Sequence, residues 1–341
     1  MNSNNNTTSV KSNSSEVTIV SLSLQSSVQP VRFWTYVFFD VFSLICTFFD
    51  LYYLLADRTL RRALNNHVLI VLLIVGLIDE STNIPWILYN DHNRAPLLKS
   101  YIFYSFWTFI NLAFNSLQVE LFAWATIERH ILIFHNHWVA TKNKCLIFHY
   151  FPIGAIIIYY LIYYSFVFFY PFCESSFDTF LGGGFHIPCV FDHTVLGLWD
   201  LIVHQFLPTV IIVLFSIALL IRVTLQKNRL RQGVQWRKHK KMIIQLLSIS
   251  AVCIIFNVPW VLVIFAHQYG LREDIAKVGL IYTGFLYYFV IFLFPFVCCL
   301  SISEVRSKVD EKLLFWQRAR KVGPTALPMV RPRTDGKVEQ G

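Results

Sequence analysis

The chain has 341 residues, of which 55% are hydrophobic and 17% aromatic, while only 14% are charged. Soluble proteins carry about 25% charged residues, so this composition excludes an ordinary soluble domain and favours a membrane protein. The formal net charge of +9 does not indicate nucleic-acid binding, because the basic residues gather in loops on one side of the apolar segments.

Residues 1–32 form a polar tail rich in Ser and Asn. The tail has no apolar core of signal-peptide length, so we expect the first apolar segment to direct the chain to the membrane. Asn5, Asn6 and Asn13 each stand two residues before a Thr or Ser, as N-glycosylation acceptors do. A glycosylated extracellular tail and an unmodified disordered tail are both open interpretations.

Seven apolar segments follow the tail, and each is long enough to cross a bilayer core as a helix of about 20 residues. In lipid the backbone must satisfy its own hydrogen bonds, which favours helices over open strands. The short loops place neighbouring helices side by side and antiparallel. We therefore predict an all-α membrane protein, a seven-transmembrane helix bundle. The predicted spans are residues 33–56, 67–89, 101–127, 146–169, 199–222, 242–266 and 276–300.

The lysines and arginines predict the orientation of this bundle. With seven spans the termini lie on opposite sides, and only six of the 29 lysines and arginines fall on the amino-terminal side. Loops rich in Lys and Arg stay in the cytosol. We expect a multi-pass protein of the plasma membrane with an extracellular amino terminus, whose cytosolic basic rim attracts anionic lipid.

Polar side chains lie inside the second and third predicted spans. Asp79 and Glu80 stand in the middle of the second span, and acids within a membrane are candidate functional residues. In the third span, residues spaced by three and four share one helical face, which we expect to look into the bundle. This face comprises Asn111, Asn115, Gln118, Phe122, Ala125 and Arg129.

Arg129 ends this face on the cytosolic side. We expect its neighbour Glu128 to pair with it, at a mouth of the bundle that a partner can reach. The alternative is a boundary arginine that snorkels to the lipid headgroups. Glu120 lies off this face and is expected to hydrogen-bond a neighbouring helix.

Prolines stand within the last three spans, at Pro208, Pro259 and Pro295. Each one removes a backbone hydrogen bond and permits a kink. These helices are therefore candidates for moving parts.

The longest predicted extracellular loop, residues 171–198, holds Cys173 and Cys189. Extracellular conditions permit disulfides, so we expect these cysteines to bridge; two free thiols are the alternative. The loop is acidic and has no Lys or Arg, which would steer a basic peptide or only aid solubility. Residues 303–320 have the pattern of an amphipathic helix on the membrane surface. We expect residues 321–341 to form a disordered cytoplasmic tail.

Between residues 33 and 320 the chain resembles the rhodopsin-like G-protein-coupled receptors. The resemblance is carried by Asp79, Glu128-Arg129-His130, Pro208, Phe256-Asn257-Val258-Pro259 and Phe294-Pro295-Phe296-Val297-Cys298. It implies a receptor, not an enzyme, that binds an extracellular ligand and activates a heterotrimeric G protein, with no cofactor and no metal. It also implies that the inner half of the sixth span moves outward, so that Arg129 helps to receive the carboxyl-terminal helix of Gα.

The chain departs from the family pattern at several of these positions. Asn257 stands where the family has Trp, while Phe294 and Cys298 replace the Asn and Tyr of the last span. The resemblance still implies a switch at Glu128, Arg129 and His130. The interior and hinge positions that it implies are Asp79, Gln118, Pro208, Asn257, Pro259 and Pro295. The ligand-pocket candidates are Asn111, Asn115, His204, Asn257, Tyr282 and Tyr288.

Two rival functions are weighed against the receptor. A seven-helix ion or proton-coupled transporter or channel would use the acids of the first two spans, Asp40, Asp50, Asp79 and Glu80. A membrane enzyme would need chemistry at His130, His135 and His137, but no matching ligand set completes a metal site in the sequence. A slightly favoured ligand for the receptor is a basic peptide.

Overall fold

The computed structural model describes residues 5–93, 100–134, 136–138, 141–170, 194–229 and 233–301. Within these residues the chain is helical throughout and contains no strand. The long helices of the first half are α1 (Asn5–Ala56), α3 (Leu64–Asn93), α4 (Tyr101–Phe134) and α6 (Phe151–Phe169). Those of the second half are α8 (Leu207–Arg229), α9 (Gly233–Gln268), α10 (Glu273–Tyr287) and α11 (Phe289–Ser301). Short elements join them: α2 (Arg58–Arg62), η1 (Asn136–Trp138), α5 (Lys142–Cys145), η2 (Leu146–Tyr150), α7 (Thr194–Trp199) and η4 (Asp200–Phe206).

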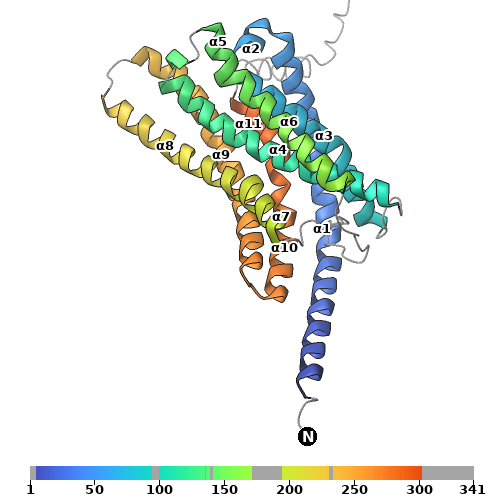
Figure 1. Ribbon diagram of the computed structural model, residues 1–341. Helices are drawn as coiled ribbons and strands as arrows, with labels where there is room; N and C mark the ends of the chain where they lie inside the picture. Colours follow the sequence, from blue (N-terminus) through green and yellow to red (C-terminus); the bar gives the residue numbers. More distant parts are fainter. Residues whose placement is uncertain are drawn as a thin grey trace, which may run out of the picture.

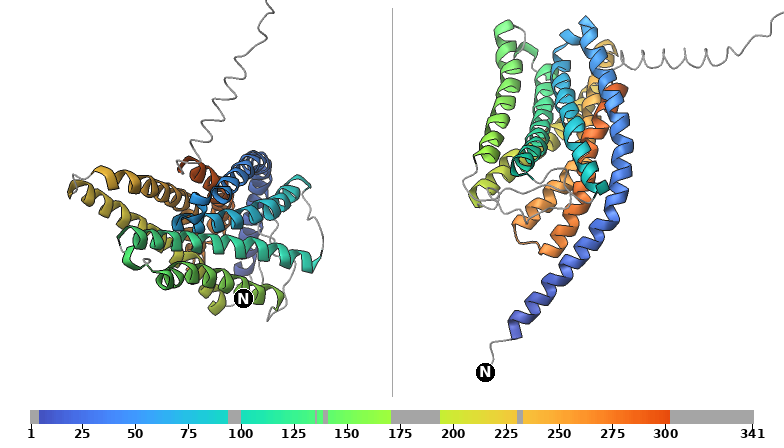
Figure 2. Two further views of the ribbon diagram at one scale, coloured as in Figure 1. Left: turned by 90° about the horizontal axis from the view of Figure 1, so that it is seen from above. Right: turned by 90° about the vertical axis from the view of Figure 1, so that its right-hand side faces the viewer.

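The helices form one bundle with α4 near its middle (Figure 1). α4 packs against α3, α6 and α8, and it also touches α9. α1 packs against α3 and α11, and α9 packs against α8, α10 and α11, which closes the ring. α1 runs the length of the bundle and projects beyond it (Figure 2). We call the end that carries α2 and α5 the α2–α5 end, and the end with the α9–α10 turn the α10 end.

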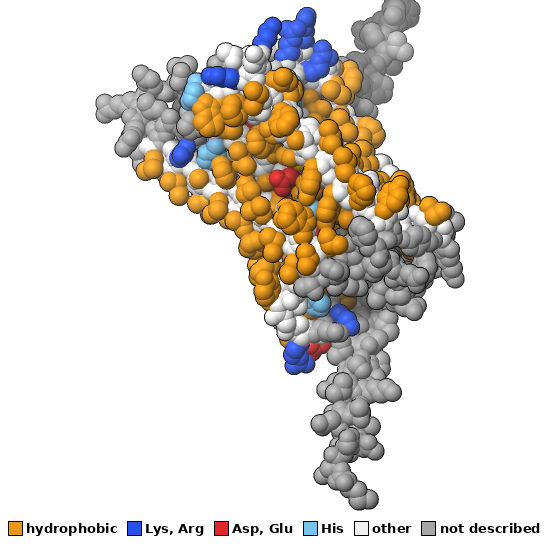
Figure 3. Space-filling view, viewed as in Figure 1, with side chains coloured by type: hydrophobic (Ala, Val, Ile, Leu, Met, Phe, Trp, Pro, Cys, Tyr) orange, Lys and Arg blue, Asp and Glu red, His pale blue; other side chains and the backbone are white. Residues whose placement is uncertain are grey.

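Among the described residues, six helical segments are long and apolar enough to cross a membrane. This result confirms an α-helical protein with several segments that could span a membrane. α4 is not among the six, although it has 34 residues. α4 carries three side-chain amides, two glutamates and Arg129, which lower its apolar character. The amides, Glu128 and Arg129 are buried in the bundle, while Glu120 is partly exposed. The outer surface is apolar over its middle, and Lys and Arg side chains gather at the two ends (Figure 3).

Each predicted span overlaps observed helices, but span 199–222 is divided between η4 and α8, and span 276–300 between α10 and α11. The largest difference is at the amino terminus. α1 begins at Asn5 and continues through Pro30, so the segment from residue 5 to residue 32 is helical rather than a disordered tail. Of this tail, the structure describes the backbone of Asn5, Asn6 and Asn13 but not their side chains. Cys173, Cys189, His135, the predicted helix 303–320 and the tail 321–341 lie outside the described residues.

Two π-helical turns stand directly before prolines. η2 precedes Pro152, and the amide of Phe151 donates to the carbonyl of Leu146, five residues back. η4 precedes Pro208, and the amide of Leu207 donates to the carbonyl of Ile202 in the same way. Proline lacks an N–H and its ring clashes with the carbonyl four residues earlier, so a wider turn before it relieves the clash. Pro259 and Pro295 lie inside α9 and α11.

The buried apolar residues form two clusters. The larger one joins α3, α4, α6 and α8 and includes Leu72, Phe122 and Ile212. The smaller one is mostly aromatic and joins α1, α3, α4 and the α10–α11 junction around Tyr36 and Trp107. The polar side chains of α4 lie between and beside these clusters, so the packing around them fixes where they point.

Candidate functional site

Glu128, Arg129 and His130 lie in the last two turns of α4, toward the α2–α5 end. They are only 2%, 4% and 7% exposed. Successive residues of a helix point about 100° apart, so the three side chains meet three different neighbours. This triplet is the candidate functional site.

Glu128 makes a buried side-chain contact with His149 Nδ1. The sequence suggested that Glu128 would pair with Arg129, and the two groups interact electrostatically. The contact with His149 was not expected. Because η2 turns His149, which is fully buried, toward the Glu128 face of α4, Glu128 also has a partner from another element.

Arg129 points into a small cavity between α3, α4, α8 and α9. The cavity has a volume of about 10 Å³, roughly the room of one water molecule. Besides Arg129, it is lined by Leu69, Leu72, Phe122, Ala125, Thr126, Ile212, Ile249, Ser250 and Cys253. Arg129 is therefore enclosed rather than open to a partner.

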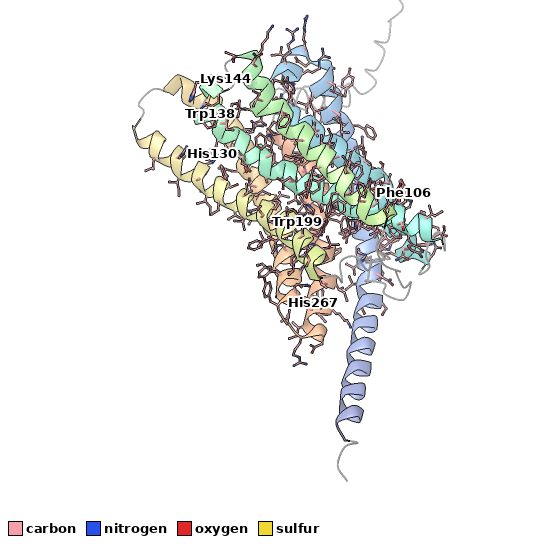
Figure 4. The ribbon with its side chains drawn as sticks, in the orientation of Figure 1. Phe106, His130, Trp138, Lys144, Trp199 and His267 are labelled. Atoms are coloured by element: carbon pink, nitrogen blue, oxygen red, sulfur yellow. The ribbon has the colours of Figure 1, made fainter. Side chains whose placement is uncertain are left out.

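His130 connects α4 to α8. Its Nε2 atom lies 2.8 Å from the backbone carbonyl oxygen of Phe215, and its ring meets the Phe215 ring edge-on at 5.2 Å between centroids. Because a carbonyl oxygen only accepts hydrogen bonds, His130 donates from Nε2. Figure 4 labels His130 on α4 toward the same end of the bundle as Trp138 and Lys144.

The predicted polar face of α4 does look into the bundle. Asn111, Asn115 and Gln118 are 6%, 5% and 2% exposed. Asn111 Oδ1 accepts three hydrogen bonds: from Asn83 Nδ2 at 2.9 Å, from Asn115 Nδ2 at 3.0 Å and from Tyr288 Oη at 2.9 Å. This acceptor ties α3, α4 and the α10–α11 junction together.

A second polar network surrounds His204 in η4. His204 Nδ1 lies 2.8 Å from Asp200 Oδ1, and its Nε2 lies 2.9 Å from Tyr159 Oη. Tyr164 donates to the same Asp200 oxygen at 2.9 Å, and Tyr160 reaches Glu120 on α4 at 3.4 Å. Rings of Tyr159, Tyr160, Tyr163 and Tyr164 all pack around the His204 imidazole.

The six ligand-pocket candidates are therefore not gathered in one place. Asn111, Asn115 and Tyr288 share one hydrogen-bond network, while His204 belongs to the other. Asn257 is fully buried and donates to Thr209 Oγ1 at 2.9 Å, beside the second network. Tyr282 is 48% exposed and lies on the outer surface. Ligand binding by these residues stays a prediction.

The acids of the first two spans form a buried seam between α1 and α3. Asp40, Asp50, Asp79 and Glu80 are at most 7% exposed. Glu80 accepts hydrogen bonds from Ser43 and, at 3.5 Å, from Thr47. Both oxygens of Asp50 and Asp79 lack a hydrogen-bond partner among the described residues. One face of α1 carries four polar residues at spacings of 3, 4 and 3: Asp40, Ser43, Thr47 and Asp50. This periodicity is the sequence signal that could have predicted the seam.

Sequence reasoning also missed an ion pair near the α10 end. Arg32 of α1 makes two hydrogen bonds to Asp91 of α3, one of them from Nε to Oδ2 at 2.7 Å. The two side chains are 9% and 0% exposed. Arg32 precedes the first predicted span, but α1 extends farther toward the amino terminus than predicted and carries Arg32 into the bundle.

Among the described residues, no group of three or more His, Cys, Asp or Glu side chains could hold a metal ion. The five cysteines in the described part of the chain are free thiols. A scan against models of known protein families finds no match, and a search of curated proteins finds no similar chain. The function is therefore argued from the site.

Proposed function

We propose that the chain is a plasma-membrane receptor with seven spans, which binds an extracellular ligand and activates a heterotrimeric G protein through its α2–α5 end. The observation that carries the proposal is the position of Arg129. Arg129 lies near the end of the central helix α4, in a cavity bounded by α3, α8 and α9. Its sequence neighbours bind two other elements: Glu128 contacts His149 of η2, and His130 contacts Phe215 of α8.

We propose that α4, the third span in chain order, also crosses the membrane and brings the six apolar segments to seven spans. At 1.5 Å per residue its 34 residues extend about 51 Å, more than the ~30 Å of hydrocarbon that a span must cross. The amino-terminal end of α1 and the final residues of α11 lie toward opposite ends of the bundle (Figure 1). An odd number of crossings produces this arrangement, and the six apolar segments alone would not.

The exposed charges favour a cytosolic α2–α5 end. Arg58, Arg61 and Arg62 in α2, with Lys142 and Lys144 in α5, are all exposed there. At the α10 end, Arg272 is exposed but pairs with Asp274 at 2.6 Å. The positive-inside rule then places the Arg129 cavity on the cytosolic side, where a G protein is available.

Activation requires that this cavity open. Ile249, Ser250 and Cys253 of α9 form the wall opposite the α4 residues of the cavity. Pro259 lies six residues farther along α9, and a proline inside a helix removes a backbone hydrogen bond and permits bending. Bending of α9 at Pro259 would withdraw this wall and expose Arg129. A ligand that favours the opened form shifts the population toward it.

The test is nucleotide exchange on a panel of Gα subunits in membranes that contain the protein, measured without ligand and with a library of peptides and small molecules. We expect at least one Gα to respond to the wild-type chain. We expect Arg129→Ala to lower that exchange at least tenfold, while Arg272→Ala, at the opposite end, leaves it unchanged. Equal exchange by the Arg129→Ala and wild-type proteins, at equal surface amounts, would refute the proposal.

An ion or proton-coupled transporter is the second candidate function. The buried seam of Asp40, Asp50, Asp79 and Glu80 favours it, because acids inside a membrane mark ion paths as well as switches. Flux into liposomes that contain the purified protein separates the two functions. Flux that disappears in Glu80→Gln, with no response from any Gα, would favour the transporter.

A further inference from the structure

The contact between Glu128 and His149 continues as a chain of contacts to the surface. His149 Nε2 lies 2.9 Å from His67 Nδ1. His67 Nε2 lies 2.8 Å from the backbone carbonyl oxygen of Arg61. Glu128 and His149 are buried, while His67 is partly exposed at the α2–α5 end. The chain thus joins solvent to the residue beside Arg129.

The Arg61 carbonyl determines where the protons are. It lies at the carboxyl-terminal end of the five-residue helix α2, where carbonyls lack helical partners. A carbonyl oxygen accepts only, so His67 must donate from Nε2. In neutral His67 the other nitrogen, Nδ1, is then an acceptor, and His149 must donate to it from Nε2. Neutral His149 would in turn present its Nδ1 lone pair to Glu128.

An ionised Glu128 also presents only lone pairs at this contact. Two acceptors would then face each other, so the chain of hydrogen bonds requires one additional proton. The proton can sit on Glu128, on His149, or on His67 with His149 in the opposite tautomer. In all three placements every contact has one donor and one acceptor.

We propose that Glu128, His149 and His67 form a proton-binding site that holds a single shared proton and exchanges it with solvent through His67. Proton binding at this site does not depend on whether the protein activates a G protein. Loss of the proton leaves one contact without a donor, which weakens the attachment of α4 to η2 and α3 beside Arg129. The α2–α5 end of the bundle is then sensitive to alkaline pH.

The titratable and charged groups around the relay come from α4, α5, η2 and α2. Arg129 on α4 and Cys145 on α5 both interact electrostatically with Glu128. The Tyr150 ring of η2 packs against the rings of His149 and His67, with centroids 4.6 Å and 5.6 Å away. On the solvent side the charged neighbours are exposed: Arg58, Arg61 and Arg62 of α2, and Lys142 and Lys144 of α5.

Glu128→Gln is the decisive variant. A glutamine amide donates to His149 Nδ1, so the chain of hydrogen bonds is complete without the shared proton. Unfolded Glu and His hold almost no protons between about pH 7.5 and 9.5. Where the folded site holds its proton, unfolding of the wild-type protein therefore releases one proton that unfolding of Glu128→Gln does not.

The experiment is reversible unfolding of the full chain in mixed micelles, followed across this pH range. We expect the folded-to-unfolded ratio of the wild type to fall about tenfold more per pH unit than that of Glu128→Gln. His267→Gln, an exposed histidine at the α10 end, should keep the wild-type slope. Parallel slopes for wild type and Glu128→Gln would overturn the proposal.

A second measurement needs no substitution in the relay. Isotope-labelled histidine and glutamate spectra of the wild type at about pH 8.5 should show an imidazolium at His149 or His67, or a protonated carboxyl at Glu128. Neutral histidines together with an ionised Glu128 at that pH would overturn the proposal even if the variant failed to fold.

Discussion

Replacing Asn111 with leucine should destabilise the bundle more than the same replacement at Asn115. The two asparagines are one helical turn apart on α4 and are equally buried, at 6% and 5% exposure. They differ in their hydrogen bonds. Asn111 Oδ1 accepts from three donors, while Asn115 Nδ2 donates only to the oxygens of Asn111, at 2.6 Å to the carbonyl and 3.0 Å to the side chain.

The magnitude follows from the donors left behind. Asn111→Leu removes the acceptor of Asn83 Nδ2 and of Tyr288 Oη, whereas Asn115 Nδ2 keeps the backbone carbonyl of residue 111. An unsatisfied buried donor costs about 1–3 kcal/mol, so two of them cost about 2–6 kcal/mol. Asn115→Leu removes a donor from an acceptor that keeps two others, at a cost of about 0.5–1.5 kcal/mol.

The assay is the free energy of unfolding of the purified protein in mixed micelles, with far-UV circular dichroism as the probe. A loss for Asn111→Leu at least twice that for Asn115→Leu is expected. Equal losses would show that Asn111 Oδ1 is not the point on which the three helices converge.

Two further substitutions test the polar contacts at other places in the bundle. Arg32→Met leaves Asp91 buried without its cation and should lower the free energy of unfolding by about 3–5 kcal/mol. The double variant Arg32→Met with Asp91→Leu should recover most of this loss. A double variant no more stable than Arg32→Met would contradict the prediction. His204→Phe removes the hydrogen bonds to Asp200 and Tyr159 and should lower the free energy of unfolding by about 1–3 kcal/mol. Tyr159→Phe removes only one of these bonds, from a partly exposed tyrosine, and should lower it by less than about 1.5 kcal/mol. The thermal midpoints of the two variants in detergent check this order.

The local pattern of the sequence was enough to predict the apolar helices and the inward face of α4. Long apolar segments can only be helices in lipid, so the predicted span 67–89 falls inside α3, and span 146–169 ends where α6 ends. Spacings of three and four placed Asn111, Asn115 and Gln118 on one face, and all three are buried. The predicted link from Glu120 to a neighbouring helix also exists, through Tyr160.

The sequence pattern failed where a side chain chooses between distant partners. Adjacency suggested Arg129 as a partner of Glu128 but did not signal the contact with His149, which is 21 residues away. Arg32 and Asp91 are 59 residues apart, and nothing local to either residue signals the other. The helical amino-terminal segment was missed because its polar composition does not distinguish a projecting helix from a disordered tail.

By itself the sequence determined that this is a helical membrane protein and which faces of its helices are polar, since both properties depend on residues within a few turns of one another. Only the tertiary structure decided which polar side chains meet. The two π-turns before Pro152 and Pro208 rotate His149 and His204 toward their carboxylates, and the packing of α9 against α4 encloses Arg129. Such contacts depend on the rotation and relative height of whole helices, which are set by packing across the bundle and not by any one segment of the chain.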